Sequence, residues 1–117
     1  MRDWFAWQQF PDFQRDGYPE ASDGPGVYEL RHRSTGKHIL FGRSKNVARR
    51  MKSLLPKSHG GHGTRNNLRK REYVAEHLPD VEYRTRDCAT EDEAKELERR
   101  LKYEHTYVFH ERGRNTD

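Results

Sequence analysis

A phenol and a guanidinium are predicted to meet at one end of a β-hairpin in the first half of the chain. Residues 27 to 33 and 37 to 43 are rich in β-branched and aromatic side chains, with turn-forming residues between them. If Thr35-Gly36 is a two-residue turn, Tyr28 lies opposite Arg43; a register shifted by one residue is the alternative. A guanidinium can bind phosphate oxygens, and a phenol whose pKa is lowered by cations can deprotonate a water. The pair therefore suits chemistry on a phosphate ester.

A helix with two adjacent arginines is predicted to follow the hairpin, over residues 45 to 55. Ser44 or Asn46 can cap its first turn. Its apolar stripe, at about 100° per residue, consists of Val47, Met51, Leu54 and Leu55. Arg50 lies on the flank of this stripe and Arg49 on the opposite side. We therefore expect only Arg50 to be held near the sheet.

A carboxylate borders the apolar stripe of the last predicted helix, which follows a strand over residues 81 to 86. The helix begins at a capping box that starts with Thr90, and it runs to about residue 105. Its stripe is formed by Ala94, Leu97 and Leu101. Glu98 lies on one edge of the stripe and Glu93 on the other, so periodicity alone does not choose between them. A carboxylate beside the core is costly unless it is paired or binds a metal; a salt bridge from Glu98 to Arg50 is the alternative to a metal site.

Basic and histidine side chains gather between these two helices. Residues 56 to 66 form a glycine-rich loop, and residues 67 to 78 are predicted to form a helix whose first half is basic. The predicted nucleic-acid contacts are Lys45, His59, His62, Arg65, Arg69, Lys70 and Arg71. An ordinary surface loop and a solvated helix face are the alternatives. Zinc binding by the two loop histidines is disfavoured because a second pair of ligands is missing.

The composition is that of one small domain with an ionic surface. Of 117 residues, 31% are hydrophobic and 36% are charged, so the core must be small. The net charge of +4 permits contact with phosphates. Because no segment approaches the roughly 20 apolar residues of a membrane helix and no signal sequence is evident, we expect a soluble cytoplasmic protein without membrane contact. The single cysteine, Cys88, excludes an internal disulfide and suits a reducing compartment.

Residues 1 to 23 are predicted to form an aromatic-rich extension that packs on the domain. Its rings are Trp4, Phe5, Trp7, Phe10, Phe13 and Tyr18. Such rings can cover an open sheet face, which we favour over stacking on nucleic-acid bases. We expect the domain itself to occupy residues 24 to 110 and a polar tail to occupy residues 111 to 117.

The tripeptides Gly26-Val27-Tyr28 and Leu40-Phe41-Gly42, followed by helices carrying Arg50 and Glu98, resemble the GIY-YIG nuclease domain superfamily. The run Gly42-Arg43-Ser44-Lys45-Asn46-Val47 is similar to the N-terminal incision domain of the bacterial excision repair nuclease. The resemblance extends over residues 24 to 110. It implies an α/β (α+β) fold of the GIY-YIG type, with a small three-stranded, mainly antiparallel sheet flanked by helices.

The resemblance also implies a metal-dependent endonuclease that hydrolyses DNA phosphodiester bonds. Its catalytic residues would be Tyr28, Arg43, Arg50 and Glu98. Glu98 would hold one Mg²⁺ or Mn²⁺ ion, and the arginines would neutralise charge on the phosphate. A protein partner could supply specificity, because nothing in the sequence resembles a separate DNA-recognition domain.

Two positions depart from the family pattern. Leu40 stands where the second tripeptide usually begins with tyrosine, and Leu54 stands where a tyrosine or histidine usually follows the helix arginine. Both changes remove polar groups from the expected site. The alternative function is therefore a catalytically impaired nucleic-acid-binding module of the same fold. An interaction domain that uses the N-terminal aromatic residues has the least support.

Overall fold

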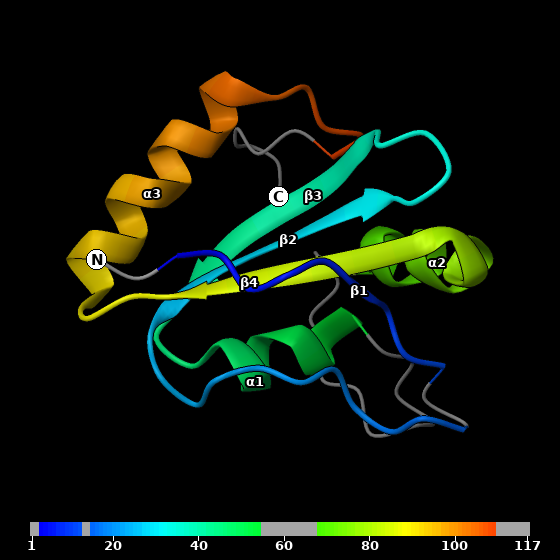
Figure 1. Ribbon diagram of the computed structural model, residues 1–117, viewed down its shortest axis with the longest axis horizontal. Helices are drawn as coiled ribbons and strands as arrows, with labels where there is room; N and C mark the ends of the chain where they lie inside the picture. The colour runs from blue at the N-terminus through cyan, green and yellow to red at the C-terminus, as the bar shows by residue number, and fades with distance from the viewer. Residues whose placement is uncertain (1–2, 13–14, 55–67, 110–117) are drawn as a thin grey trace.

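A four-stranded antiparallel sheet forms the centre of the molecule in a computed structural model that describes residues 3–12, 15–54 and 68–109 (Figure 1). The strand order is β1-β4-β2-β3. The strands are β1 (Gln8–Gln9), β2 (Gly26–His32), β3 (His38–Ser44) and β4 (Val81–Asp87). The three strands expected from the sequence agree with β2, β3 and β4 to within one residue at each end. The mixed α and β fold class is confirmed.

The prediction of three strands is wrong in number, because the N-terminal extension adds β1 to the free edge of β4. Gln8 pairs with Tyr83 and Gln9 with Glu82. The Phe10 amide also donates to the carbonyl oxygen of Val81. An uncovered strand edge leaves backbone donors and acceptors without partners, and the extension supplies them along this part of β4.

The β2–β3 hairpin has a longer turn than predicted. The His32 amide donates to the Lys37 carbonyl oxygen, so residues 33 to 36 form the connection, with Gly36 at a φ of +75°. The pairing register also shifts between Leu30 and Arg31. A left-handed φ favours glycine, which explains Gly36 at the end of this turn. The predicted two-residue turn is therefore wrong, and the register derived from it changes.

Three α-helices flank the sheet: α1 (Val47–Met51), α2 (Leu68–Glu76) and α3 (Glu91–Glu104). Helix α1 is shorter than predicted, because the chain continues as a 3₁₀ turn over Lys52–Leu54. Asn46 caps α1 through a hydrogen bond from the Arg49 amide to its Oδ1 atom. A second 3₁₀ turn, Leu78–Asp80, leads from α2 into β4. No helix in the described ranges is long and apolar enough to cross a membrane.

The cap of α3 follows the sequence closely. The Thr90 Oγ1 atom accepts a hydrogen bond from the Glu93 amide, as predicted for a capping box. The Glu93 carboxylate accepts in turn from the amide of Ala89, one residue before the cap. Its apolar residues Ala94, Leu97 and Leu101 lie on one side of the helix, and this side faces the sheet and is buried.

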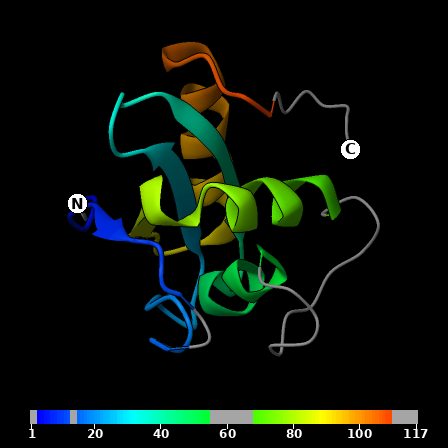
Figure 2. The same ribbon diagram turned by 90° about the vertical axis from the view of Figure 1, so that its right-hand side faces the viewer.

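The sheet carries a separate apolar cluster on each face, because successive strand residues point in opposite directions. Helices α1 and α2 cover one face, which we call the α1 face; α3 covers the other, the α3 face (Figures 1 and 2). The α1-face cluster contains Phe10, Tyr28, Leu30, Ile39, Leu40, Val47, Met51, Leu54, Val74, Val81 and Tyr83. The α3-face cluster contains Val27, Phe41, Cys88, Ala94, Leu97, Leu101 and Tyr107.

The N-terminal aromatic residues contribute to both faces. Phe10 is fully buried in the α1-face cluster and meets Tyr83 edge-on, with ring centroids 5.7 Å apart. Trp4 and Trp7 lie against the guanidinium of Arg84, at 4.1 and 4.6 Å from its Cζ atom to the ring centroids. These three rings thus cover the sheet, in line with the packing interpretation.

Candidate functional site

Arg43 and Glu98 meet on the α3 face, although 55 residues separate them in the chain. The Arg43 Nε atom donates to the Glu98 Oε1 atom over 3.1 Å. Arg43 lies near the end of β3, and Glu98 lies in α3 beside the buried residue Leu97. The two side chains are 38% and 31% exposed. The structure thus brings together two of the four predicted catalytic residues, in a position open to solvent.

The partner of Glu98 differs from the one that we considered as an alternative. A salt bridge from Glu98 to Arg50 was the competing interpretation, but in the structure Glu98 forms its ion pair with Arg43. Arg50 is exposed on α1, as is Arg49, and neither forms an ion pair within the described residues. The expectation that only Arg50 is held near the sheet is therefore wrong. The five-residue α1 buries Val47 and Met51 and turns both arginines outward.

Tyr28 is not on the same face as Arg43. The observed register pairs Tyr28 with Gly42 and Val27 with Arg43, so the predicted Tyr28–Arg43 register is off by one residue. Directly paired strand residues share a face, which puts Arg43 beside Val27 on the α3 face. Tyr28 is instead buried in the α1-face cluster and is 5% exposed.

The Tyr28 ring lies directly over the backbone of Gly42. A methyl group added at Gly42 would overlap the Tyr28 hydroxyl and would lie 2.7 Å from its Cζ atom. Glycine at the end of the second tripeptide therefore makes room for the tyrosine of the first. This packing explains why both residue types are needed at this end of the hairpin.

The two positions that depart from the family pattern are part of the core. Leu40 is completely buried opposite Leu30, and Leu54 is 2% exposed. Both belong to the α1-face cluster. Leucine at these positions contributes to packing between β3, α1 and α2, so a polar group there would have to be buried.

The predicted phosphate-binding residues are described only in part. His59, His62 and Arg65 lie outside the described residues. Lys45 and Arg69 are exposed, whereas Lys70 and Arg71 are half-buried. The Nη1 atom of Arg71 is buried without a hydrogen-bond partner among the described residues. Of the predicted phosphate-binding residues that the structure describes, two are therefore exposed: Lys45, which precedes α1, and Arg69, which lies at the start of α2.

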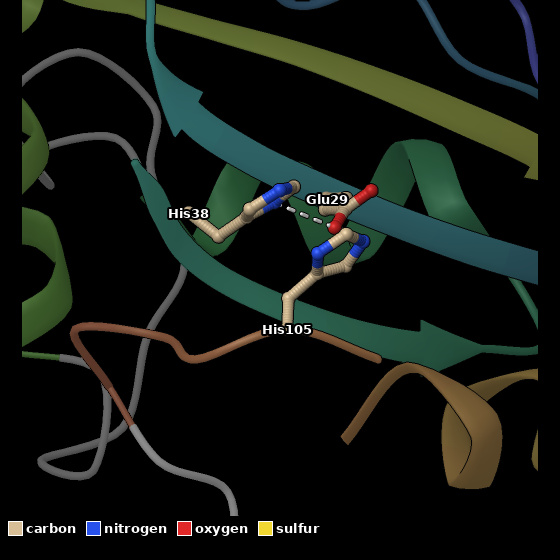
Figure 3. Close-up of side chains that lie close together, drawn as sticks. All are labelled: Glu29, His38 and His105. Atoms are coloured by element: carbon tan, nitrogen blue, oxygen red, sulfur yellow. Dashed lines mark ion pairs between the residues drawn. The ribbon is translucent and has the colours of Figure 1, made fainter. Parts of the chain in front are cut away.

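A second group of chemically active side chains was missed by the sequence analysis. Glu29 from β2, His38 from β3 and His105 from the segment after α3 lie close together (Figure 3). One ligand atom from each lies within 4.8 Å of the others. The His38 Nδ1 atom is 2.9 Å from the Glu29 Oε2 atom, and the rings of His38 and His105 stack with centroids 3.8 Å apart.

Glu29 is a fully buried carboxylate with partners on both oxygens. Arg84 approaches its Oε1 atom with Nε at 2.9 Å and Nη2 at 2.8 Å. The Tyr107 hydroxyl donates to its Oε2 atom over 2.6 Å. These contacts compensate the loss of hydration of the carboxylate. We call Glu29, His38, Arg84, His105 and Tyr107 the Glu29 cluster.

Burial controls the protonation of the groups around Glu29. It lowers the pKa of His38, against the opposing effect of the nearby Glu29 carboxylate. Burial also raises the pKa of Tyr107 well above its usual range, and the hydrogen bond to Glu29 acts in the same direction. Tyr107 is therefore a neutral hydrogen-bond donor, and the His38 ring favours its neutral form relative to an exposed histidine.

No sequence signal pointed directly to this cluster. Glu29 stands in a strand of otherwise apolar residues, Val27 to Leu30, which is the one hint that its carboxylate needs an internal partner. The two histidines are 67 positions apart, and His105 lies just beyond the end of α3. Only the folded chain brings them together.

Comparisons of the chain with protein-family models, with curated proteins and with solved structures find no match in any of the three.

Proposed function

We propose that this domain is a metal-dependent endonuclease of the GIY-YIG type that hydrolyses DNA phosphodiester bonds in the cytoplasm. The contact between Arg43 and Glu98 carries the proposal. Both residues were selected from the sequence for this chemistry, and they meet at a partly exposed position. A carboxylate oxygen is a hard ligand of the kind that Mg²⁺ and Mn²⁺ prefer, and the guanidinium beside it can bind phosphate oxygens.

The geometry of Glu98 leaves room for a metal ion. Its Oε1 atom accepts from Arg43, and its Oε2 atom has no hydrogen bond to any described residue. A carboxylate oxygen at such a partly exposed position is a suitable ligand for Mg²⁺ or Mn²⁺, which retain several waters. The ion would neutralise charge on the phosphate and activate the attacking water.

The residues around Glu98 have distinct tasks in this proposal. Arg43 orients the Glu98 carboxylate and adds positive charge where the phosphate approaches. Arg50 and Lys45 are exposed and can bind the DNA backbone. Tyr28 is buried on the α1 face, so its hydroxyl would take part only if the α1 face opens toward the phosphate.

The test is a cleavage assay with purified protein on supercoiled and linear DNA, with Mg²⁺, Mn²⁺ or EDTA. We expect metal-dependent cleavage by the wild type that falls at least about 100-fold in Glu98→Gln, as for loss of a principal charge-stabilising group. Glu96→Gln is the matched control, because Glu96 is an exposed α3 residue paired with Arg99. Equal cleavage by wild type and Glu98→Gln would contradict the proposal.

A second candidate is a nucleic-acid-binding module without catalytic activity. The burial of Leu40 and Leu54 in the core favours it, since neither position offers a polar group to a substrate. This candidate predicts salt-dependent DNA binding with no cleavage under any metal condition. Lys45→Ala with Arg69→Ala should flatten the salt dependence of binding, whereas Lys95→Ala on α3 should leave it unchanged.

A further inference from the structure

We propose that Glu29, His38 and His105 bind a zinc-type divalent transition metal ion at a site separate from Glu98. The three ligand atoms lie within 4.8 Å of one another. They come from β2, from β3 and from the segment that follows α3, so one ion would connect three parts of the chain (Figure 3).

The donor set determines which ion is expected. Two imidazole nitrogens and one carboxylate oxygen suit Zn²⁺ and neighbouring transition metals, whereas Mg²⁺ prefers oxygen ligands and water. Three protein ligands leave a fourth position for a water molecule. The site therefore differs chemically from the oxygen site proposed at Glu98.

Two of the three ligand atoms already lie close together. His38 Nδ1 and Glu29 Oε2 are 2.9 Å apart. With an ion about 2.0 to 2.2 Å from each atom, this separation gives nearly a right angle at the ion, so a tetrahedral site requires the two atoms to move slightly apart. Although the distance is that of an ion pair, the buried Nδ1 atom makes no aligned hydrogen bond among the described residues. A metal ion would give the lone pair of this nitrogen a directed partner.

The surroundings of Glu29 resemble the outer shell of a metal site. Arg84 fixes the Oε1 atom, and the Tyr107 hydroxyl fixes the Oε2 atom. Such hydrogen bonds orient a ligating carboxylate and limit its movement. Arg84 also adds positive charge near the site, which opposes a second cation. We therefore expect moderate rather than very tight affinity.

His105 is the adjustable ligand. It follows α3 in extended backbone, is only half-buried, and stacks on His38 with an angle of 21° between the rings. Parallel rings do not direct their nitrogen lone pairs at one point, so His105 must rotate about its side-chain bonds to complete the site. Its partial exposure gives both the space for this rotation and a path for the ion.

The first experiment measures Zn²⁺ binding to the metal-free full chain by calorimetry and by thermal melting. We expect one Zn²⁺ per chain and a melting temperature that rises with Zn²⁺ concentration, because the ion binds only the folded arrangement. His105→Ala should weaken binding at least about 10-fold. His77→Ala is the matched control: the His77 ring packs against Tyr73, with ring centroids 4.3 Å apart, and the substitution should leave zinc binding unchanged.

Further variants exclude other sources of zinc binding. The His59→Ala/His62→Ala double variant should bind Zn²⁺ as the wild type does, and so should Glu98→Gln. Tyr107→Phe should weaken binding by about 10-fold, because the ligating carboxylate loses its orienting donor. If His105→Ala remains folded and binds Zn²⁺ as tightly as the wild type, or if no saturable Zn²⁺ binding occurs, the proposal is wrong. Failure of this site with intact cleavage would leave the endonuclease proposal standing.

Discussion

Two carboxylates on the α3 side of the sheet, Glu98 and Glu29, each pair with an arginine, yet they lie in opposite environments. The Arg43–Glu98 pair is near the end of β3 and is about one-third exposed. Glu29 lies closer to the other end of the hairpin, fully buried, with Arg84 on one oxygen and Tyr107 on the other. These two pairs thus place the same chemical groups in one partly exposed and one buried position.

The difference between these pairs determines what each can do. An exposed ion pair contributes roughly 0–1 kcal/mol, so the Arg43–Glu98 pair can exchange its partner for a phosphate or a metal at little cost. A buried carboxylate cannot lose a partner without a large penalty, so Glu29 must keep its donors Arg84 and Tyr107. The exposed pair is suited to binding a transient substrate, and the buried cluster to holding the fold or a resident ion.

The largest expected effect comes from removing the buried charge. Glu29→Gln leaves Arg84 without its carboxylate, and we expect a loss of about 3 kcal/mol in the free energy of unfolding. Glu98→Gln is the matched surface substitution and should cost less than about 1 kcal/mol. Urea denaturation of both variants measures the two values. Similar losses at the two positions would remove the distinction between the buried and the exposed pair.

A smaller effect is expected from the hydroxyl that holds Glu29. Tyr107→Phe removes the donor to Oε2 and should cost about 1.5–3 kcal/mol, the usual range for hydrogen bonds to charged groups. Tyr103 in α3 provides the control, because its side chain is 82% exposed. Tyr103→Phe should therefore change the free energy of unfolding by less than about 0.5 kcal/mol. Urea denaturation at constant pH measures the free energy of unfolding of both variants.

The contact between Gly42 and Tyr28 at the open end of the hairpin can be tested separately from the Arg43–Glu98 pair, because the two lie on opposite faces of the sheet. Gly42→Ala introduces a methyl group against Tyr28 on the α1 face and should cost about 1–3 kcal/mol by overpacking. Gly24→Ala is the control, since its nearest contact, Ser22 Oγ at 3.5 Å, is ordinary. The Arg43–Glu98 interaction should persist in Gly42→Ala because it lies on the other face. A loss of stability in the control equal to that of Gly42→Ala would argue against the tyrosine contact as the cause.

The smallest effect is the coupling between Arg43 and Glu98 themselves. A double-mutant cycle with Arg43→Gln and Glu98→Gln should give about 0.2–1 kcal/mol at low salt. In 1 M NaCl, where the Debye length is about 3 Å, this coupling should largely disappear. The exposed Glu96–Arg99 pair of α3 serves as the reference. A salt-independent coupling above about 2 kcal/mol would show that the pair behaves as a buried one.

The local features of the fold could be read from the sequence because they depend on near neighbours. Alternation and turn residues located β2, β3 and β4 to within one residue. Thr90 and Glu93 identified the start of α3 through hydrogen bonds within a single helical turn. The apolar stripe of α3 then indicated which side of this helix packs on the sheet, and Glu98 at its edge.

Residue pairing across the sheet could not be obtained in the same way. A four-residue turn and a register shift between Leu30 and Arg31 moved Tyr28 from a position opposite Arg43 to one opposite Gly42. Because successive strand residues point to opposite faces, a change of one residue in register separates two side chains that were expected to meet. Spacing in the sequence carries little information about such a shift.

The Glu29 cluster was decided by tertiary structure alone. The carboxylate of Glu29 is buried because β2 lies between β3 and β4, and because the segment after α3 pairs with β3 and places the Tyr107 hydroxyl on it. Its partners Arg84, His105 and Tyr107 come from more than 50 residues further along the chain. The sequence determined that a charged residue sits within an apolar strand, whereas its partners follow from which strands and helices pack together. Desolvation then requires that every oxygen brought inside finds a donor, and only the assembled fold supplies those donors.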